Sequence, residues 1–222
     1  MDKQIAFVIP TTSNKRNWTD IKDSYLYQSL SKLKYEKINV YIGIDNDDIF
    51  FVSKYRALPQ FLPHLNLIFI INKNEKGNVV SIWNHLTRIA IQDGNEYIFC
   101  IGDDIIYPDD KLWLPLMITK LELNNNIGFS AGDSGNPQLP MTQFMIHKTH
   151  FETFGYVFNP LLKNWYCDNY LNELYPKKYI NYFEYIKLGN NGGEPRYTPL
   201  NDAKLYKMCV RRDKKKLNKL IN

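Results

Sequence analysis

The sequence predicts one α/β domain of the Rossmann-like kind, in which a mixed, mostly parallel sheet is flanked by helices. The chain has 222 residues, a length typical of a single domain. Hydrophobic residues make up 44% of it and charged residues 23%, as in an average globular protein that buries a core. Strand-like and helix-like patterns alternate through the first half, which favours repeated βαβ units.

Six short apolar runs are the predicted strands. They cover residues 5–9, 38–44, 65–71, 97–101, 127–131 and 143–147. The first four runs are almost continuously apolar rather than alternating. This pattern is typical of strands that are covered on both faces, as they are in parallel sheets.

Apolar side chains at helical spacing predict helices between these strands. One helix begins after the cap candidates Thr19 and Asp20, a second covers residues 79–90, and a third covers residues 115–123. The second half of the chain contains long loops rich in Gly, Asn and Pro. We find no linker that would divide the chain, so we expect one domain over residues 1–222.

The charge is mildly basic and concentrated near the C-terminus. The net charge is +5, and the basic residues of the last segment, 201–222, include Arg211, Arg212, Lys214, Lys215, Lys216 and Lys219. We expect this segment to be a solvated helix or tail, or to make weak contact with an anionic membrane surface or another polyanion. Because the sequence has no zinc-finger or RNP signature, we expect no nucleic-acid partner.

Cysteine usage favours a reducing compartment. Cys100, Cys167 and Cys209 are odd in number and far apart, so neither a disulfide framework nor a zinc site follows. The apolar run at residues 5–9 is too short for a signal peptide or a membrane span. We therefore expect a cytoplasmic protein, in the host cell if the chain is viral.

The most informative motif is the carboxylate pair Asp103-Asp104. It follows Gly102 at the end of a buried strand, and ligands bind at the carboxyl ends of strands in open α/β sheets. Adjacent carboxylates repel each other unless a cation neutralises them, and hard oxygen ligands favour Mn²⁺ or Mg²⁺. The alternative is a capped turn with solvated acids. Asp109 and Asp110, which follow nearby, fit the N-cap of the next helix.

At these residues the chain resembles GT-A type glycosyltransferases, especially the small inverting members found in large DNA viruses. The resemblance rests on the order and spacing of four elements: Val8-Ile9-Pro10-Thr11-Thr12, Gly43-Ile44-Asp45-Asn46-Asp47, Trp83-Asn84 and Ile101-Gly102-Asp103-Asp104. It implies a GT-A fold and transfer of a sugar from a UDP-sugar to a glycan hydroxyl, with inversion and with Mn²⁺ or Mg²⁺ as cofactor. It also implies a nucleotide-sugar half at about 1–107 and an acceptor half at about 108–200.

The resemblance implies donor-binding roles for Pro10, Thr11, Thr12, Arg16, Asp45, Asn84 and Asp103. Among them, Arg16 would reach the diphosphate and Asp45 would accept a hydrogen bond from the base. Asp104 is the favoured metal ligand, together with Asp103. His147, which ends a predicted strand, is a candidate third ligand, although a histidine at a strand end is more often structural. Asn84 would touch either the donor or the surface.

An inverting transferase also needs a base for the acceptor hydroxyl. The resemblance places it at Asp168, in a segment where an aspartate would equally serve as a helix N-cap. Asp133 is a rival base, and Glu194, in a Gly-rich loop, would belong to a lid. A sugar nucleotidyltransferase and a non-catalytic nucleotide- or glycan-binding module are the alternatives. Residues 11–16 contain no glycine, which argues against the nucleotidyltransferase.

Overall fold

The computed structural model describes residues 4–73, 76–135, 141–191 and 196–221. The strands are β1 (Ile5–Thr11), β2 (Asn39–Asp45), β3 (Asn66–Asn72), β4 (Tyr97–Cys100), β5 (Ile105–Ile106), β6 (Phe129–Asp133), β7 (Phe144–His147), β8 (Ile180–Lys187) and β9 (Gly189–Asn190). The α-helices are α1 (Tyr25–Leu30), α2 (Ile49–Lys54), α3 (Leu58–Phe61), α4 (Val79–Gln92), α5 (Trp113–Leu123), α6 (Lys148–Phe154), α7 (Cys167–Leu174) and α8 (Ala203–Ile221). Three short 3₁₀ helices are η1 (Ile21–Asp23), η2 (Tyr55–Ala57) and η3 (Lys177–Tyr179).

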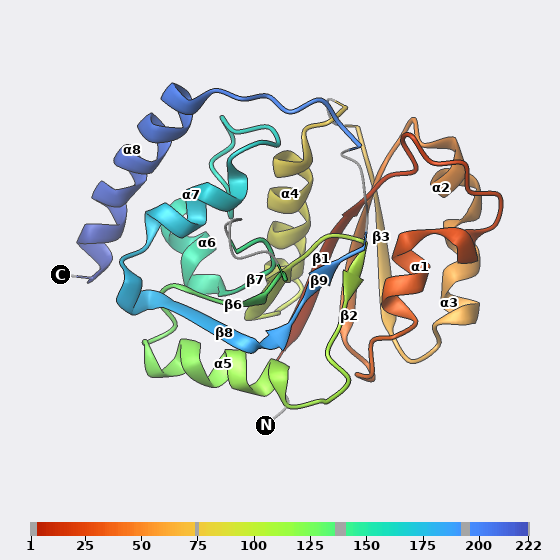
Figure 1. Ribbon diagram of the computed structural model, residues 1–222, viewed down its shortest axis with the longest axis horizontal. Helices are drawn as coiled ribbons and strands as arrows, with labels where there is room; N and C mark the ends of the chain where they lie inside the picture. Colours follow the sequence, from red (N-terminus) through yellow and green to blue (C-terminus); the bar gives the residue numbers. More distant parts are fainter. Residues whose placement is uncertain (1–3, 74–75, 136–140, 192–195, 222) are drawn as a thin grey trace.

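Seven of the described strands form one mixed sheet in the order β3-β2-β1-β4-β7-β6-β8 (Figure 1). Strands β1 to β4 run parallel to one another, whereas β7 is antiparallel to both β4 and β6. Strand β8 closes the edge parallel to β6. Strands β5 and β9 pair separately as a short two-stranded ribbon.

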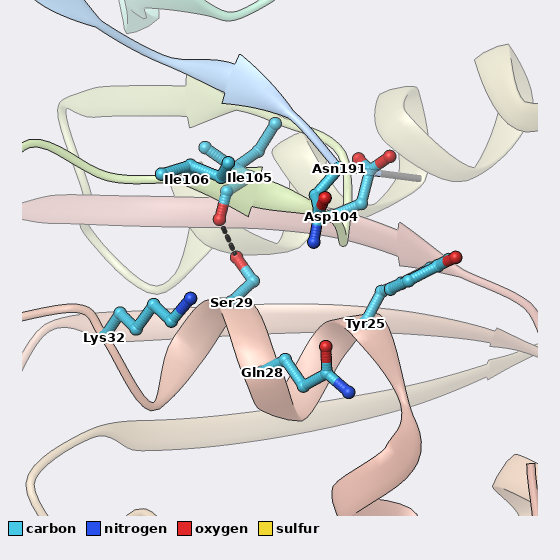
Figure 2. Close-up of a pocket in the computed structure, with 8 residues that line it drawn as sticks. All are labelled: Tyr25, Gln28, Ser29, Lys32, Asp104, Ile105, Ile106 and Asn191. Atoms are coloured by element: carbon cyan, nitrogen blue, oxygen red, sulfur yellow. Dashed lines mark hydrogen bonds between the residues drawn. The ribbon is translucent and has the colours of Figure 1, made fainter. Parts of the chain in front are cut away.

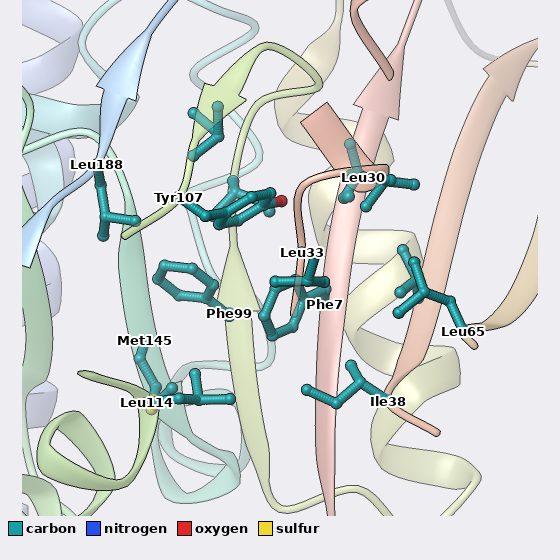
Figure 3. Packing of buried hydrophobic residues seen from close by; sticks show 14 of the residues in the cluster. Phe7, Leu30, Leu33, Ile38, Leu65, Phe99, Tyr107, Leu114, Met145 and Leu188 are labelled. Carbon is teal, nitrogen blue, oxygen red and sulfur yellow. The ribbon is translucent and has the colours of Figure 1, made fainter. Parts of the chain in front are cut away.

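Successive side chains of the central strands point into two different cores. Phe7 and Ile9 of β1 pack with α1, α2, α3 and α5, whereas Ala6 and Val8 pack with α4, α6, α7 and α8. The period of two along a strand produces this division. In the first core, the Phe7 ring meets Phe99 edge-on at a centroid distance of 5.2 Å (Figure 3). The sheet is therefore buried on both faces, as the continuous apolar runs predicted.

The strand order creates the position where a ligand would bind. The chain moves outward from β1 through β2 to β3 and then returns to place β4 on the other side of β1. In such sheets the connections at the carboxyl ends of β1 and β4 leave in opposite directions and open a crevice between them. Thr11 ends β1, and Asp103 lies three residues after the end of β4.

The six predicted strands are confirmed within one or two residues of their ends, and so are the helices at residues 79–90 and 115–123. Asp20 caps η1, as predicted. Asp109 and Asp110 are not the N-cap of α5, because that helix begins after Leu112. Instead, Asp109 pairs with Lys34, and Asp110 accepts the Leu112 N–H.

The basic C-terminal segment is helical. One face of α8 packs on the domain through Tyr206, Cys209, Val210 and Leu217. Asp213 on the same face is fully buried and accepts hydrogen bonds from Tyr156, Tyr170 and Asn159. None of the helices in the described part of the chain has the length and apolar character needed to cross a membrane.

Candidate functional site

A pocket of about 170 Å³ opens at the crevice between β1 and β4. Its lining comes from four places in the chain: Pro10, Thr11 and Thr12 at the end of β1, Val79 and Trp83 on α4, Gly102 and Asp103 after β4, and Arg196 and Tyr197 from the C-terminal part. Four residues predicted to bind the donor, Pro10, Thr11, Thr12 and Asp103, are thus brought together. Trp83, from the Trp83-Asn84 element of the resemblance, also lines the pocket.

The loop after β1 is held in place by Asp48, the N-cap residue of α2. The Asp48 carboxylate accepts the Phe51 N–H of its own helix at 3.0 Å. It also accepts the backbone N–H and the hydroxyl of Ser13, at 2.6 and 2.8 Å, and the hydroxyl of Thr12 at 3.1 Å. Asp48 is only 7% exposed, so these bonds form away from solvent. They fix the pocket wall built by Thr11 and Thr12.

Asp103 is neutralised by an arginine from a distant part of the chain. The Asp103 side chain is 1% exposed and accepts the Thr11 hydroxyl at 2.6 Å. Both of its carboxylate oxygens also accept hydrogen bonds from the guanidinium of Arg196. Burial alone would lower the pKa of Arg196, but the charge and hydrogen bonds of Asp103 raise it above its ordinary value. Sequence reasoning missed Arg196, which is 93 residues from its partner.

Asp104 lies on the other side of the same turn, closer to solvent. Figure 2 shows Asp104 beside Asn191, with its carboxylate directed away from Tyr25 of α1; all three residues line a small pocket. The Asn191 N–H donates to the backbone oxygen of Asp104 at 2.9 Å. A Cβ atom at Gly102 would stand 2.8 Å from a carboxylate oxygen of Asp104. The glycine therefore allows the Asp104 side chain to fold back over the turn.

Asp45 ends β2 next to this pocket and is 4% exposed. One of its oxygens accepts the Tyr197 hydroxyl at 3.3 Å, while Oδ1 is buried with no hydrogen-bond partner among the described residues. Burial raises the pKa of Asp45, against the lowering effect of the Tyr197 hydrogen bond. A buried acceptor without a donor is costly in a folded protein. Asp45 thus lies at a strand end with one carboxylate oxygen that no described residue satisfies.

Arg196 and Tyr197 belong to residues 196–200, which we call the crossing segment. The Asn14 side chain donates to the Arg196 carbonyl, and Arg196 donates to the Thr12 carbonyl. Further along, Asn164 bonds to the backbone of Thr198 and Leu200. The crossing segment is therefore tied to the loop after β1 and to the segment before α7, and its residues Arg196 and Tyr197 line the pocket.

Asp168 lies in the first turn of α7, outside the set of described residues that line the pocket. Burial raises its pKa from 3.8 to about 7. The N-cap of α7 is Tyr166, so Asp168 is not the cap. The rival Asp133 accepts a hydrogen bond from Lys187, which lowers the pKa of Asp133. Of the two carboxylates, Asp168 is therefore the one whose pKa is raised toward neutral pH.

The prediction that His147 is a metal ligand is wrong. His147 pairs with Tyr97 at the start of β4, whereas Asp103 and Asp104 follow the end of that strand. Because β7 is antiparallel to β4, its last residue lies at the opposite edge of the sheet. There the His147 side chain caps α6 by accepting the Thr149 N–H.

Asn84 does not touch the donor pocket either. Its side-chain oxygen accepts the N–H groups of Val157 and Phe158, and its nitrogen donates to the Phe158 carbonyl at 2.7 Å. These bonds are buried, so Asn84 fastens the loop after α6 to α4. Arg16 lies over the Tyr25 ring, 5.4 Å from its centroid. Glu194, expected in a lid, lies outside the described residues.

The described residues provide a partial metal-binding set. No cluster of three or more His, Cys, Asp or Glu side chains suited to a metal occurs among them. Asp103 is engaged by Arg196 and Thr11, whereas Asp104 is nearer to solvent. Mg²⁺ and related ions are often held by one or two carboxylates, with substrate phosphates and water completing the shell. A single carboxylate at this turn fits that kind of site.

Comparisons with known proteins bear on the fold. No family model and no curated protein matches the sequence. A cytidylyltransferase from Leptospira borgpetersenii serovar Hardjo-bovis (strain JB197) is similar in structure, with a TM-score of 0.55 and 12% identity over 91% of this chain and 82% of that chain. GalNAc-T7, solved with UDP, GalNAc and Mn²⁺, gives a TM-score of 0.55 and 12% identity over 94% of this chain. This chain spans about half the length of GalNAc-T7, covering 48% of it. The predicted fold class is confirmed: the chain has a single-domain, Rossmann-like α/β fold of the GT-A type.

Proposed function

We propose that the protein is a glycosyltransferase that moves a sugar from a UDP-sugar to a glycan hydroxyl with inversion. The observation that carries the proposal is Asp45, whose buried Oδ1 has no donor among the described residues. An N–H group of a nucleobase would satisfy this oxygen and offset its desolvation. Asp45 lies at the carboxyl end of β2, where nucleotides bind in doubly wound sheets.

The sugar-bearing diphosphate would lie between Asp45 and the carboxylate pair. Thr11 and Thr12 line this path and are held by the Asp103 and Asp48 networks. Asp104 would hold a divalent ion, and Asp103 would act mainly through Arg196. When bound, Mn²⁺ or Mg²⁺ supplies positive charge next to the leaving diphosphate. Arg16, on the same loop, is proposed to reach the diphosphate.

Asp168 is the proposed base. The acceptor hydroxyl attacks the anomeric carbon while the bond to the diphosphate breaks, and its proton passes to the Asp168 carboxylate. A base works best when its pKa is near the working pH, and burial raises the pKa of Asp168 to about 7. The acceptor would be bound by residues 108–200, which include α7. In this proposal the protein acts in the cytoplasm.

A nucleotidyltransferase is the second candidate, because the cytidylyltransferase has the same fold. Such enzymes would be expected to use a flexible, Gly-rich basic loop after β1. Here that loop has no glycine, and Asp48 fixes Thr12 and Ser13 with three hydrogen bonds. A non-catalytic binding module is the third candidate. It would bind UDP but release no product.

Thermal-shift and product assays separate these candidates. A UDP-sugar with Mn²⁺ is expected to raise the melting temperature, because a ligand that binds only the folded state stabilises it. Asp45→Asn should remove the shift, whereas Asp47→Asn should keep it, because Asp47 lies at the surface paired with Lys76. Release of UDP from a UDP-sugar supports the transferase. Release of pyrophosphate from UTP or CTP and a sugar phosphate would overturn it.

A further inference from the structure

Helix α8 carries an unusual concentration of positive charge on one side. It has eight Lys and Arg residues in 19 positions, and Asp213 is its single acidic residue. The whole chain has a net charge of only +5, so the rest of the protein is net acidic. The net excess of positive charge in the protein is thus accounted for by one helix.

Six of these basic side chains form the outer face of α8: Lys204, Lys207, Arg211, Lys214, Lys215 and Lys219. All six are exposed, and the described part of the chain provides none of them with an ion-pair partner. The acid on this helix, Asp213, points inward and is fully buried. Arg212 and Lys216 differ from the six, since they contact Tyr156. Among the described residues, none forms an ion pair with the six side chains of the outer face.

The outer face is held rigidly along its whole length. Buried residues from Tyr206 to Leu217 fix the opposite side of α8 to the domain, and α8 contacts α6 and α7. Figure 1 shows the helix along the margin of the molecule. A 19-residue helix is about 28 Å long at 1.5 Å per residue. The six basic side chains are therefore spread along the outer, convex side of one straight helix.

We infer that the outer face of α8 docks the protein on a bilayer surface that contains anionic lipids. Because the helix is straight, the basic side chains along its whole length can lie against a flat membrane surface at the same time. Met208 lies within the row and is 53% exposed, so an apolar side chain accompanies the basic ones. Long Lys and Arg stems with an apolar neighbour suit the boundary between headgroups and acyl chains.

The same face suits nucleic acid less well. Recognition helices enter the major groove, but α8 is packed against the domain over its length and has only one side available. Single strands are bound by aromatic rings on which bases stack. The outer face has no aromatic residue, and Tyr206, the tyrosine of α8, is buried. A bilayer is therefore the partner that matches both the shape and the side chains.

Vesicle sedimentation with the full-length protein tests the inference. We expect binding to vesicles of phosphatidylcholine with 30% phosphatidylserine, loss of binding at 0.5 M salt, and no binding to phosphatidylcholine alone. The triple variant Lys204→Gln, Arg211→Gln, Lys215→Gln should bind about 100-fold more weakly, because each basic residue near an anionic surface contributes about fivefold. The matched control neutralises three exposed lysines elsewhere, Lys111, Lys120 and Lys177.

The control variant has the same net charge and should retain binding within about threefold. Equal weakening of both triple variants would overturn the inference, because it would show an effect of total charge and not of this helix. Binding to phosphatidylcholine alone would overturn it as well. Stronger binding to single-stranded or double-stranded RNA than to the anionic vesicles at the same salt would assign the face to nucleic acid instead. All of the substituted residues are exposed, and melting temperatures verify that both variants fold.

Discussion

The guanidinium of Arg196 donates hydrogen bonds to both carboxylate oxygens of Asp103, at the end of the central strand pair β1 and β4. The sequence indicated that a cation must neutralise Asp103 and Asp104, and a metal ion was the expected one. In the structure an arginine supplies that charge to Asp103. If the pair binds a divalent ion as we propose, Arg196 would set how strongly it attracts that ion.

Removing the Arg196 charge should tighten metal binding in the absence of nucleotide. In Arg196→Gln the positive charge that Arg196 places on Asp103 is lost and the carboxylate pair becomes more negative, so we expect Mn²⁺ to bind at least about tenfold more tightly. Electron paramagnetic resonance of free Mn²⁺ measures the change. Arg196→Lys keeps the charge and should remain near wild type.

A suitable control is Lys187→Gln, which breaks the ion pair with Asp133 away from this turn. If Arg196→Gln and Lys187→Gln change the Mn²⁺ affinity equally, the charge of the Asp103 carboxylate does not contribute to Mn²⁺ binding.

The pH dependence of transfer should follow Asp168. A base acts when deprotonated, and burial raises the pKa of Asp168 to about 7. We expect kcat/KM to rise with pH up to about 7 and then to level off, and Asp168→Asn to lose at least about 100-fold in rate with UDP binding intact. Normal transfer by Asp168→Asn would assign the base elsewhere.

The stability of the same variant gives an independent test. A carboxyl group with an ordinary pKa of 3.8 when unfolded and about 7 when folded binds its proton more tightly in the folded state. The resulting stabilisation is complete below about pH 4 and is lost as pH rises through 7. Asp168→Asn removes this dependence, so at pH 8 it should be as stable as wild type or more stable. A loss of about 1 kcal/mol or more at pH 8 would indicate a structural carboxylate.

Asn84 should matter for stability and not for donor affinity. Asn84→Ala leaves two buried N–H groups and one carbonyl of the loop at Val157 and Phe158 without partners. We expect a loss of about 3 kcal/mol in the free energy of unfolding, measured with urea, and an unchanged Kd for UDP. His85→Ala, at the exposed neighbouring position on α4, should change stability by less than about 1 kcal/mol. A large loss of UDP affinity in Asn84→Ala alone would restore its donor-binding role.

Asp48 should affect both stability and donor binding. Asp48→Ala removes the N-cap of α2 and the bonds that hold Thr12 and Ser13. We expect a loss of about 3 kcal/mol and a clear weakening of UDP binding, seen by calorimetry. Asp47→Ala, one residue earlier in an exposed ion pair, serves as the control. Unchanged UDP affinity in Asp48→Ala would mean that the loop after β1 does not contact the nucleotide.

The sequence predicted the parallel half of the sheet well because those strands are buried on both faces. Residues 97–101 are apolar throughout, and the strand they form pairs with β1 as expected. Strand β8 was missed because it is an edge strand with several exposed, polar positions. Its pairing with β6 depends on tertiary packing, which local patterns do not encode.

Strand direction explains the error at His147. A residue at the end of a strand lies near the ligand only if that strand runs parallel to β1 and β4, and β7 runs the other way. Arg196 and Tyr197 could not be found because their partners, Asp103 and Asp45, are 93 and 152 residues away. The sequence pointed to Asp103, Thr11 and Thr12 at this pocket because they lie at, or just after, the ends of buried strands.

A crystal structure of the protein with UDP and Mn²⁺ would show whether the crevice between β1 and β4 binds the donor. We expect the uracil N–H on Oδ1 of Asp45, the diphosphate beside Thr11 and Thr12, and the metal ion on Asp104. UDP bound away from the crevice between β1 and β4, or no UDP bound at millimolar concentration, would contradict this expectation.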